Sequence, residues 1–150
     1  SNREAKRYIE SYLAHYSGVD SYMKNVVERA KADGYVETMF GRRRNLPELT
    51  SGKHMIRAFG ERVARNMPIQ GTAADIIKIA MIKVDERMKD ENLRARLVLQ
   101  VHDELIVEAP QDESMRVALI VQEEMENAVK MSVPLTADAA VGRTWYDAKG

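Results

Sequence analysis

The chain has 150 residues, of which 45% are hydrophobic and 31% charged, so it is long enough and apolar enough for one globular domain with a hydrophobic core. It has no cysteine, which excludes disulfides and thiolate metal sites, and no apolar run approaches the roughly 20 residues that span a bilayer. We therefore expect a cytoplasmic protein without a membrane partner.

The formal net charge is zero, but the charges are unevenly distributed along the chain. From Arg42 to Arg65 there are seven basic residues and two acidic ones, whereas from Asp103 onward ten acidic residues accompany four basic ones. This distribution fits a surface that binds a polyanion such as nucleic acid, and it fits an ordinary solvated helix face equally well.

Two helices are predicted at the start of the chain. Apolar residues repeat at helical spacing from Ala5 to Tyr16 and again from Val19 to Ala30, with Gly18 between the two repeats and Gly34 as the stop of the second. We expect the tyrosines of these helices to pack in a core rather than to stack on bases.

A short strand is predicted from Tyr35 to Met39, followed by a loop from Phe40 to Thr50. The pattern then predicts a helix from His54 to Asn66 that is interrupted near Pro68, and a long helix that continues to about Asp90. The buried stripe of this long helix is expected to consist of apolar residues at helical spacing: Ile76, Ile77, Ala80, Met81, Val84 and Met88.

The segment from Leu97 to Ala109 contains two apolar runs rich in β-branched residues, which predict the strands of a tight hairpin around His102, Asp103 and Glu104. One interpretation is a simple polar turn. The other is a metal-binding carboxylate that opens into a wet cleft, because a buried carboxylate without a partner is costly. Since successive strand residues point to opposite faces, one carboxylate, Asp103, is expected to reach the metal. A phosphohydrolase with a His-Asp doublet is disfavoured, because the chain has only three histidines.

A third long helix is predicted from Asp112 to Lys130, and a final strand from Pro134 to Val141. The apolar residues of the helix are Met115, Leu119, Val121, Met125 and Val129. Trp145 and Tyr146 are expected to anchor the tail. Helices and an antiparallel hairpin segregated in this way predict an α+β domain.

Three polar residues, Arg62, Asn66 and Gln70, follow one another at intervals of four. If the helix continues past Pro68, their side chains share one face. The minor groove presents an acceptor at purine N3 or pyrimidine O2 in every Watson-Crick pair, so a row of donors could check pair geometry without reading sequence. An ordinary polar helix face is the alternative.

Four blocks of the chain closely resemble the C-terminal end of the bacterial DNA polymerase I enzymes, which are family A DNA polymerases. They are Gly34–Leu49, Glu61–Met81, Leu97–Pro110 and Val133–Lys149, and with them the resemblance covers essentially the whole chain. It implies that residues 34–150 form the C-terminal part of the palm, an antiparallel sheet with a central hairpin packed against long helices. Residues 1–33 would be a remnant of the fingers helices.

The same resemblance assigns roles to individual residues. Asp103 would be one of two aspartates that hold two Mg²⁺ ions, with Glu104 supporting the catalytic site beside it and His102 contacting the primer end. The residues that match duplex-contacting positions are Arg62, Asn66 and Gln70, and those that match a basic stretch near the base of the fingers are Arg42, Arg43 and Arg44.

The activity implied is template-directed DNA synthesis, in which a deoxynucleotide is transferred to a primer 3′-hydroxyl. Primer-template DNA and deoxynucleoside triphosphates would be the partners. The first polymerase motif, with the other metal-binding aspartate, would lie upstream of Ser1, so we expect the chain alone to be inactive, with uncovered apolar surface through which it can self-associate. The alternative is a non-catalytic nucleic-acid-binding or interaction module that reuses a polymerase palm.

Overall fold

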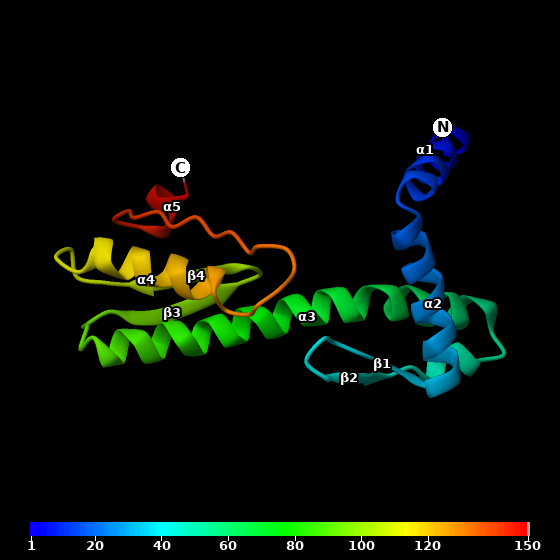
Figure 1. The fold of residues 1–150 in the computed structure, drawn as a ribbon, viewed down its shortest axis with the longest axis horizontal. Coiled ribbons are helices and arrows are strands. Elements are labelled where there is room, and N and C mark those ends of the chain that lie inside the picture. Colours follow the sequence, from blue (N-terminus) through cyan, green and yellow to red (C-terminus); the bar gives the residue numbers. More distant parts are fainter. Residues whose placement is uncertain (150) are drawn as a thin grey trace. The chain divides into compact units, whose positions relative to one another are not determined.

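The computed structural model describes residues 1–149 (Figure 1). Its elements in chain order are α1 (Asn2–His15), α2 (Ser17–Asp33), β1 (Tyr35–Glu37), β2 (Arg43–Asn45), the 3₁₀ helix η1 (Pro47–Thr50), α3 (His54–Asp90), β3 (Arg96–Val101), β4 (Glu104–Glu108), α4 (Ser114–Glu126) and α5 (Trp145–Ala148). The chain forms two compact units, residues 1–72 and residues 73 onward. Within the described residues, no helix is both long and apolar enough to cross a membrane. The fold is the predicted α+β class, with helices and two small antiparallel hairpins.

The first two helices are separated at Tyr16, and not at Gly18 as predicted. α1 begins with a capping box, in which the Ser1 hydroxyl and the Glu4 carboxylate satisfy each other's backbone N–H groups. Tyr16 then leaves the helical conformation, with φ −105° and ψ 63°, and Gly18 lies inside α2. Gly34 ends α2 as predicted, because its φ of 80° lies in the left-handed region that a residue without a Cβ adopts at no steric cost.

The tyrosines of α1 and α2 do not form a core, so this prediction is wrong. Their exposed fractions lie between 42% and 71% for the set Tyr8, Tyr12, Tyr16 and Tyr22. The buried residues of α2 are instead Val27 and Ala30. Helical spacing of apolar residues predicts a helix with an apolar face, but it does not say what covers that face.

The predicted loop after β1 contains a second strand. β2 pairs antiparallel with β1, with Val36 opposite Arg44, and all three residues of β2 are exposed. The sequence did not reveal this strand because exposed basic residues show no apolar alternation. The core of the first unit consists of Val27, Ala30, Val36, Leu46, Leu49 and Ala64.

α3 is one continuous helix, so the predicted interruption near Pro68 is wrong. Proline cannot donate a backbone hydrogen bond and usually breaks or kinks a helix interior. Here the Thr72 hydroxyl donates to the Pro68 carbonyl and accepts a hydrogen bond of 3.0 Å from the Met39 N–H. Gly71 allows Thr38, the residue after β1, to lie close to α3, because a Cβ at position 71 would be 2.7 Å from Thr38 Cγ2. The contacts of Met39 with Thr72 and of Thr38 with Gly71 are tertiary, and contacts of this kind can outweigh the local preference of proline.

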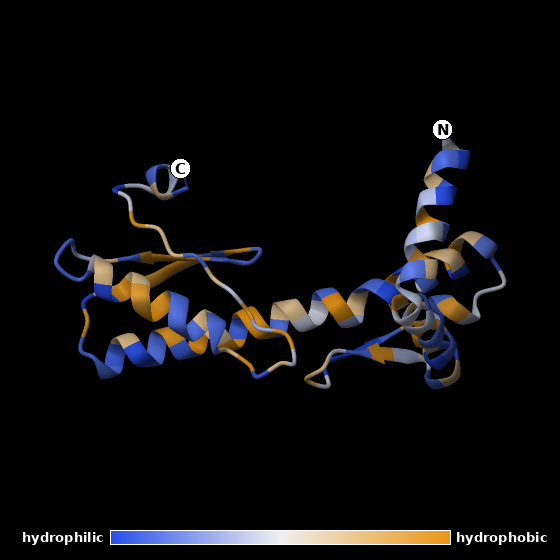
Figure 2. Cartoon of the chain, turned by 45° about the horizontal axis from the view of Figure 1, so that its top comes forward, coloured by the Kyte–Doolittle hydropathy of each residue, from blue (hydrophilic) through white to orange (hydrophobic). Residues whose placement is uncertain are grey.

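In the second unit, the β3–β4 hairpin packs against the second part of α3 and against α4. The core is formed by Val84 and Met88 of α3 with Val117 and Ile120 of α4. Leu105 and Val107 of β4 pack against it. Figure 2 shows the strands mostly in orange and the helices alternating between orange and blue along their turns. Of the predicted α3 stripe, Ile77, Ala80, Val84 and Met88 are buried, and Ile76 and Met81 are partly buried.

Three predictions for the last part of the chain are wrong. α4 is shorter than expected, and its buried residues are Val117 and Ile120, whereas Met115 is 75% exposed. Residues 134–141, which lie within the described part, form no strand. Tyr146 is 88% exposed and Trp145 is 44% exposed, so neither ring is packed into a core. Helical spacing predicts a helix but not which of its sides is covered, and a strand needs a neighbour with which to pair.

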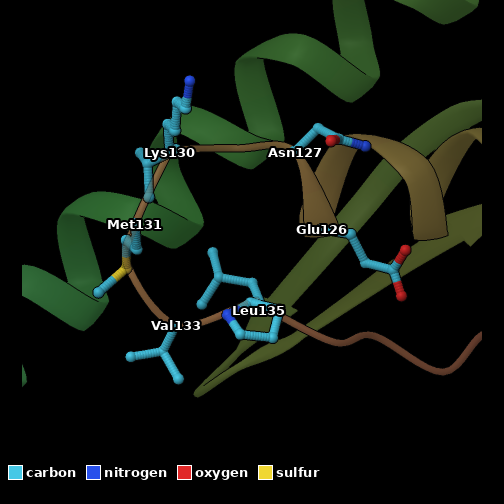
Figure 3. A pocket seen from close by; sticks show the side chains of 8 residues that line it. Glu126, Asn127, Lys130, Met131, Val133 and Leu135 are labelled. Atoms are coloured by element: carbon cyan, nitrogen blue, oxygen red, sulfur yellow. The ribbon is translucent and has the colours of Figure 1, made fainter.

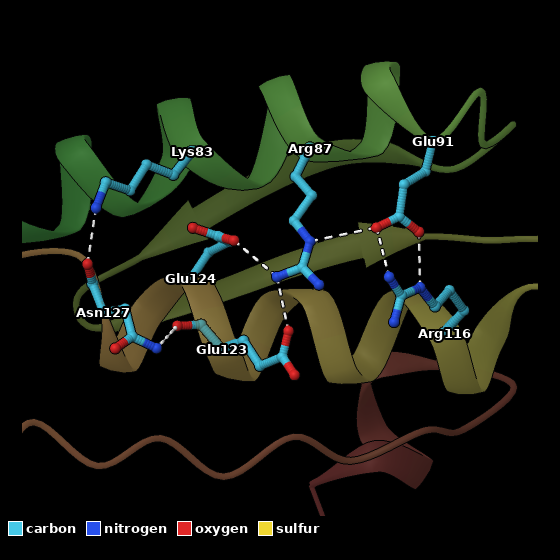
Figure 4. Close-up of polar contacts among 7 residues, drawn as sticks. All are labelled: Lys83, Arg87, Glu91, Arg116, Glu123, Glu124 and Asn127. Atoms are coloured by element: carbon cyan, nitrogen blue, oxygen red, sulfur yellow. Dashed lines mark hydrogen bonds and ion pairs between the residues drawn. The ribbon is translucent and has the colours of Figure 1, made fainter.

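Ion pairs join α3 to α4 (Figure 4). Arg87 lies 2.8 Å from Glu124 and 2.6 Å from Glu123, and these hydrogen-bonded carboxylates raise the pKa of the arginine. Glu91 accepts hydrogen bonds from both Arg87 and Arg116, which lower the pKa of its carboxyl group. The helices that support the hairpin are therefore linked by charge as well as by the apolar core.

Candidate active site and nucleic-acid interface

The hairpin predicted from the sequence is present, and His102 and Asp103 form its tip. Val101 of β3 pairs with Glu104 of β4, which leaves a two-residue connection between the strands. His102 has a φ of 54°, in the left-handed region that two-residue hairpin turns require and that few non-glycine residues adopt. The Gln100 side-chain amide donates a hydrogen bond to the His102 carbonyl and holds this turn.

Asp103 is exposed at the tip of the hairpin. Within residues 1–149, no arginine or lysine forms an ion pair with it and no side chain is hydrogen-bonded to it. Its carboxylate is therefore accessible to a cation from solvent, which is the property that a magnesium ligand needs. Carboxylate oxygen is also the donor type that Mg²⁺ prefers.

The described residues do not complete a metal site around this carboxylate. Among them, no group of three or more histidine, aspartate or glutamate side chains is placed to hold an ion. Asp103 fits one ligand position, and the remaining ligands have to come from water, substrate or other protein segments. Mg²⁺ commonly binds in this way, through one or two carboxylates together with phosphate oxygens and retained waters.

Glu104 is the first residue of β4 and is partly buried. Because side chains alternate along a strand, it lies on the face opposite Leu105 and Val107, which pack on the core. One carboxylate oxygen, Oε1, lies 3.2 Å from Lys149 Nζ. The other, Oε2, is buried and has no hydrogen-bond partner among the described residues. No sequence pattern pointed to Lys149, which is far from Glu104 along the chain.

In the first unit, Arg62, Asn66 and Gln70 form one exposed row along α3. The condition set by the sequence, that the helix continues past Pro68, is met. The Arg62 guanidinium lies 5.8 Å from the centre of the Phe59 ring, and none of the three side chains forms an ion pair within residues 1–149. The row therefore presents donor groups to solvent, which a row of nucleic-acid acceptors could use.

The three consecutive arginines are all exposed, but they differ in their contacts. Arg43 stacks 4.4 Å from the centre of the Tyr35 ring, and its Nε donates to Glu37 at 3.0 Å. Arg44, next in the strand, points to the opposite face of the hairpin. Arg42 precedes the strand, and its backbone N–H donates to the Thr38 hydroxyl. Arg43 therefore has partners within its own hairpin, while all three arginines remain exposed.

Acidic neighbours also reduce the positive charge further along this basic stretch. Lys31 lies 3.3 Å from Glu61 and lowers the pKa of that carboxyl group, and Arg65 lies 3.4 Å from the same carboxylate. The Arg57 guanidinium donates to the Ser51 carbonyl at 2.8 Å. Arg62 is the member of the stretch that combines exposure with a place in the polar row.

A hollow of about 490 Å³ lies where the chain leaves α4 (Figure 3). It is lined by Glu126, Asn127, Val129, Lys130, Met131, Val133, Pro134 and Leu135. None of the residues predicted to act in catalysis or nucleic-acid binding lines it, so it is not the candidate active site.

Comparison with known proteins gives a consistent result over the full chain. Residues 1–147 match the model of the family described as DNA polymerase family A. DNA polymerase I of Bacillus caldotenax is 54% identical over 149 residues, which cover 99% of this chain and 17% of that protein. DNA polymerase I of Bacillus subtilis is 52% identical over the same length and share. The chain thus spans about a sixth of the length of these relatives.

A solved structure shares the fold as well. It is the POL domain of Pol1 from M. smegmatis, in complex with a DNA primer-template and dNTP. The TM-score is 0.95 at 47% sequence identity, and the match covers 100% of this chain and 26% of that chain.

Proposed function

Because this chain belongs to DNA polymerase family A, we propose that it forms the C-terminal portion of the polymerase active site of a longer enzyme. Residues 34–150 would supply part of the palm, and residues 1–33 the end of the fingers. The reaction is template-directed DNA synthesis, in which the primer 3′-hydroxyl attacks the α-phosphorus of a deoxynucleoside triphosphate and pyrophosphate leaves. The relative in complex with primer-template and dNTP supports these partners.

Asp103 would hold catalytic Mg²⁺ in this reaction. When bound, two Mg²⁺ ions lower the pKa of the attacking hydroxyl and stabilise the charge on the transferred phosphoryl group. The Asp103 carboxylate supplies one hard oxygen ligand from an accessible hairpin tip. His102, at the same tip, would contact the primer end, and Glu104 would support the site from the start of β4. With one carboxylate in place, the chain alone is expected to incorporate no nucleotide.

Arg62, Asn66 and Gln70 would contact the primer-template duplex from its minor-groove side. Their exposure and common face support this, because the groove offers an acceptor at every base pair and needs a row of donors. Arg42 and Arg44 would add contacts to phosphates, which position a duplex but carry no sequence information. Arg43, stacked on Tyr35 and paired with Glu37, would shape the β1–β2 hairpin instead.

The observation that carries this proposal is the exposed carboxylate of Asp103, which no cation within residues 1–149 neutralises, in a chain whose residues 1–147 match the family. The test is Asp103→Ala in the longer polymerase, followed by rapid-quench measurement of single-nucleotide incorporation. We expect incorporation to be lost and primer-template affinity to stay nearly unchanged. Asp90→Asn, at another exposed aspartate of the same unit, is the control and should keep normal turnover. Normal turnover of Asp103→Ala would refute the metal role.

A further inference from the structure

The C-terminal helix α5 contacts the catalytic hairpin through one ion pair. Lys149 follows directly after α5, and its Nζ lies 3.2 Å from Oε1 of Glu104. α5 itself is fixed at its start by a capping box, in which the Thr144 hydroxyl and the Asp147 carboxylate are 2.7 Å apart. The lysine is therefore presented to the hairpin from a short but locally stabilised helix.

A second contact restricts the Lys149 side chain. Its ammonium group lies 5.2 Å from the centre of the Trp145 ring, within the range of a cation–π interaction. Trp145 is one turn before Lys149 in the helix. The ammonium group is thus in contact with an aromatic ring on its own helix and with a carboxylate on the hairpin.

The ion pair lies on one side of the Glu104 carboxylate. Oε1 faces Lys149, and Oε2 is buried without a hydrogen-bond partner among the described residues. Glu104 is also adjacent in sequence to Asp103, a second carboxylate at the hairpin tip. A cation on one side of Glu104 keeps that side chain in one orientation and offsets part of the local negative charge.

We propose that Lys149 is a positioning residue for DNA synthesis, which acts by holding the Glu104 carboxylate in place beside Asp103. This inference rests on the proposed function. Lys149 touches neither substrate nor metal in this proposal. It acts through Glu104, whose second oxygen stays available to a donor supplied by the assembled site.

The test is Lys149→Met in the longer polymerase, with single-turnover incorporation measured at saturating nucleotide. We expect the rate constant to fall about three- to fivefold, the size of effect that a partly exposed ion pair produces. Nucleotide KM and primer-template Kd should not change. Lys149→Arg, which keeps the charge, should restore most of the rate. In a Glu104→Gln background, Lys149→Met should have no further effect, because the two residues act as a unit.

Two controls separate the possible results. Lys89→Met removes a lysine of another exposed ion pair, with Asp85, in the same unit and should leave the rate unchanged. A normal rate for Lys149→Met would overturn the inference. It would also be overturned if Lys149→Met lowered the rate equally in the unaltered and the Glu104→Gln polymerase, because that loss would reflect the docking of α5 alone. The proposed function is tested separately: it fails only if Asp103→Ala remains active.

Discussion

Removing the Gln70 side-chain amide tests the polar row of α3 most directly. Gln70 is exposed, so Gln70→Ala removes no buried contact of the free protein and should not affect its stability. What it removes is a donor for the minor groove. A neutral hydrogen bond contributes about 0.5–1.5 kcal/mol net, which corresponds to a two- to twelvefold loss of primer-template affinity. Arg62→Ala removes a charged donor and should cost about 1.5–3 kcal/mol.

The assay should show which acceptor is involved. Affinity and mispair extension are measured in the longer polymerase with natural duplexes and with duplexes that contain 3-deazaguanine, which lacks the N3 acceptor. On natural DNA, Gln70→Ala should weaken binding and extend mispairs more readily, independently of base sequence. On DNA that lacks the acceptor at the contacted position, the same substitution should have no further effect, because the hydrogen bond is already missing.

A matched control lies one residue away. Ile69 is 53% exposed on the same helix but points to a different side, so Ile69→Ala should leave binding and mispair extension unchanged. The minor-groove assignment is refuted if Gln70→Ala has no effect on natural DNA. It is equally refuted if the loss is the same size on 3-deazaguanine DNA, since the partner would then be another group.

Two predictions concern stability. Gly71→Ala places a Cβ 2.7 Å from Thr38 Cγ2 and should destabilise the first unit by about 1–3 kcal/mol. Gly18 lies inside α2 with nothing within 4 Å of a Cβ at its position, so Gly18→Ala should stabilise the unit by up to about 1 kcal/mol. Thermal unfolding measures both changes, and equal shifts in the same direction would contradict the packing argument. Glu91 has its pKa lowered, first by the hydrogen bond from Arg116, so its contribution to stability is present above its ordinary pKa of 4.5 and is lost as pH falls through the lower pKa of the folded state. The free energy of unfolding of Glu91→Gln should therefore differ from that of the unaltered chain near neutral pH, and the two values should converge in strong acid. A difference that stays constant with pH would exclude the ion pair as the cause.

The parts of the fold that could be predicted from sequence are those determined by neighbours in the chain. The β3–β4 hairpin follows from two β-rich runs separated by three polar residues, the last of which starts β4, and the end of α2 follows from Gly34. The strand β2 and the continuity of α3 depend on contacts between distant residues. Thr72 accepts a hydrogen bond from Met39, 33 residues earlier in the chain, and no local pattern around Pro68 reports that contact.

The candidate site shows the same division. Four-residue spacing predicted the row of Arg62, Asn66 and Gln70, because helix geometry alone places these residues together once the helix is continuous. Spacing said nothing of the contacts of Arg43, which stacks on Tyr35 and pairs with Glu37 across the β1–β2 hairpin. Nor could it connect Lys149 with Glu104, which meet only when the tail folds back onto the hairpin.

The exposure of Asp103 has a consequence for the order of events at the site. A carboxylate in solvent keeps its hydration, so the hairpin requires no cation for its own stability. A single carboxylate also binds Mg²⁺ weakly, because the ion gives up its waters reluctantly and needs further oxygens around it. Nucleotide phosphates are the natural source of those oxygens in phosphoryl transfer. In the proposed function, stable metal binding at Asp103 therefore depends on the triphosphate as well as on the second aspartate of the longer enzyme, which couples assembly of the metal site to the presence of substrate.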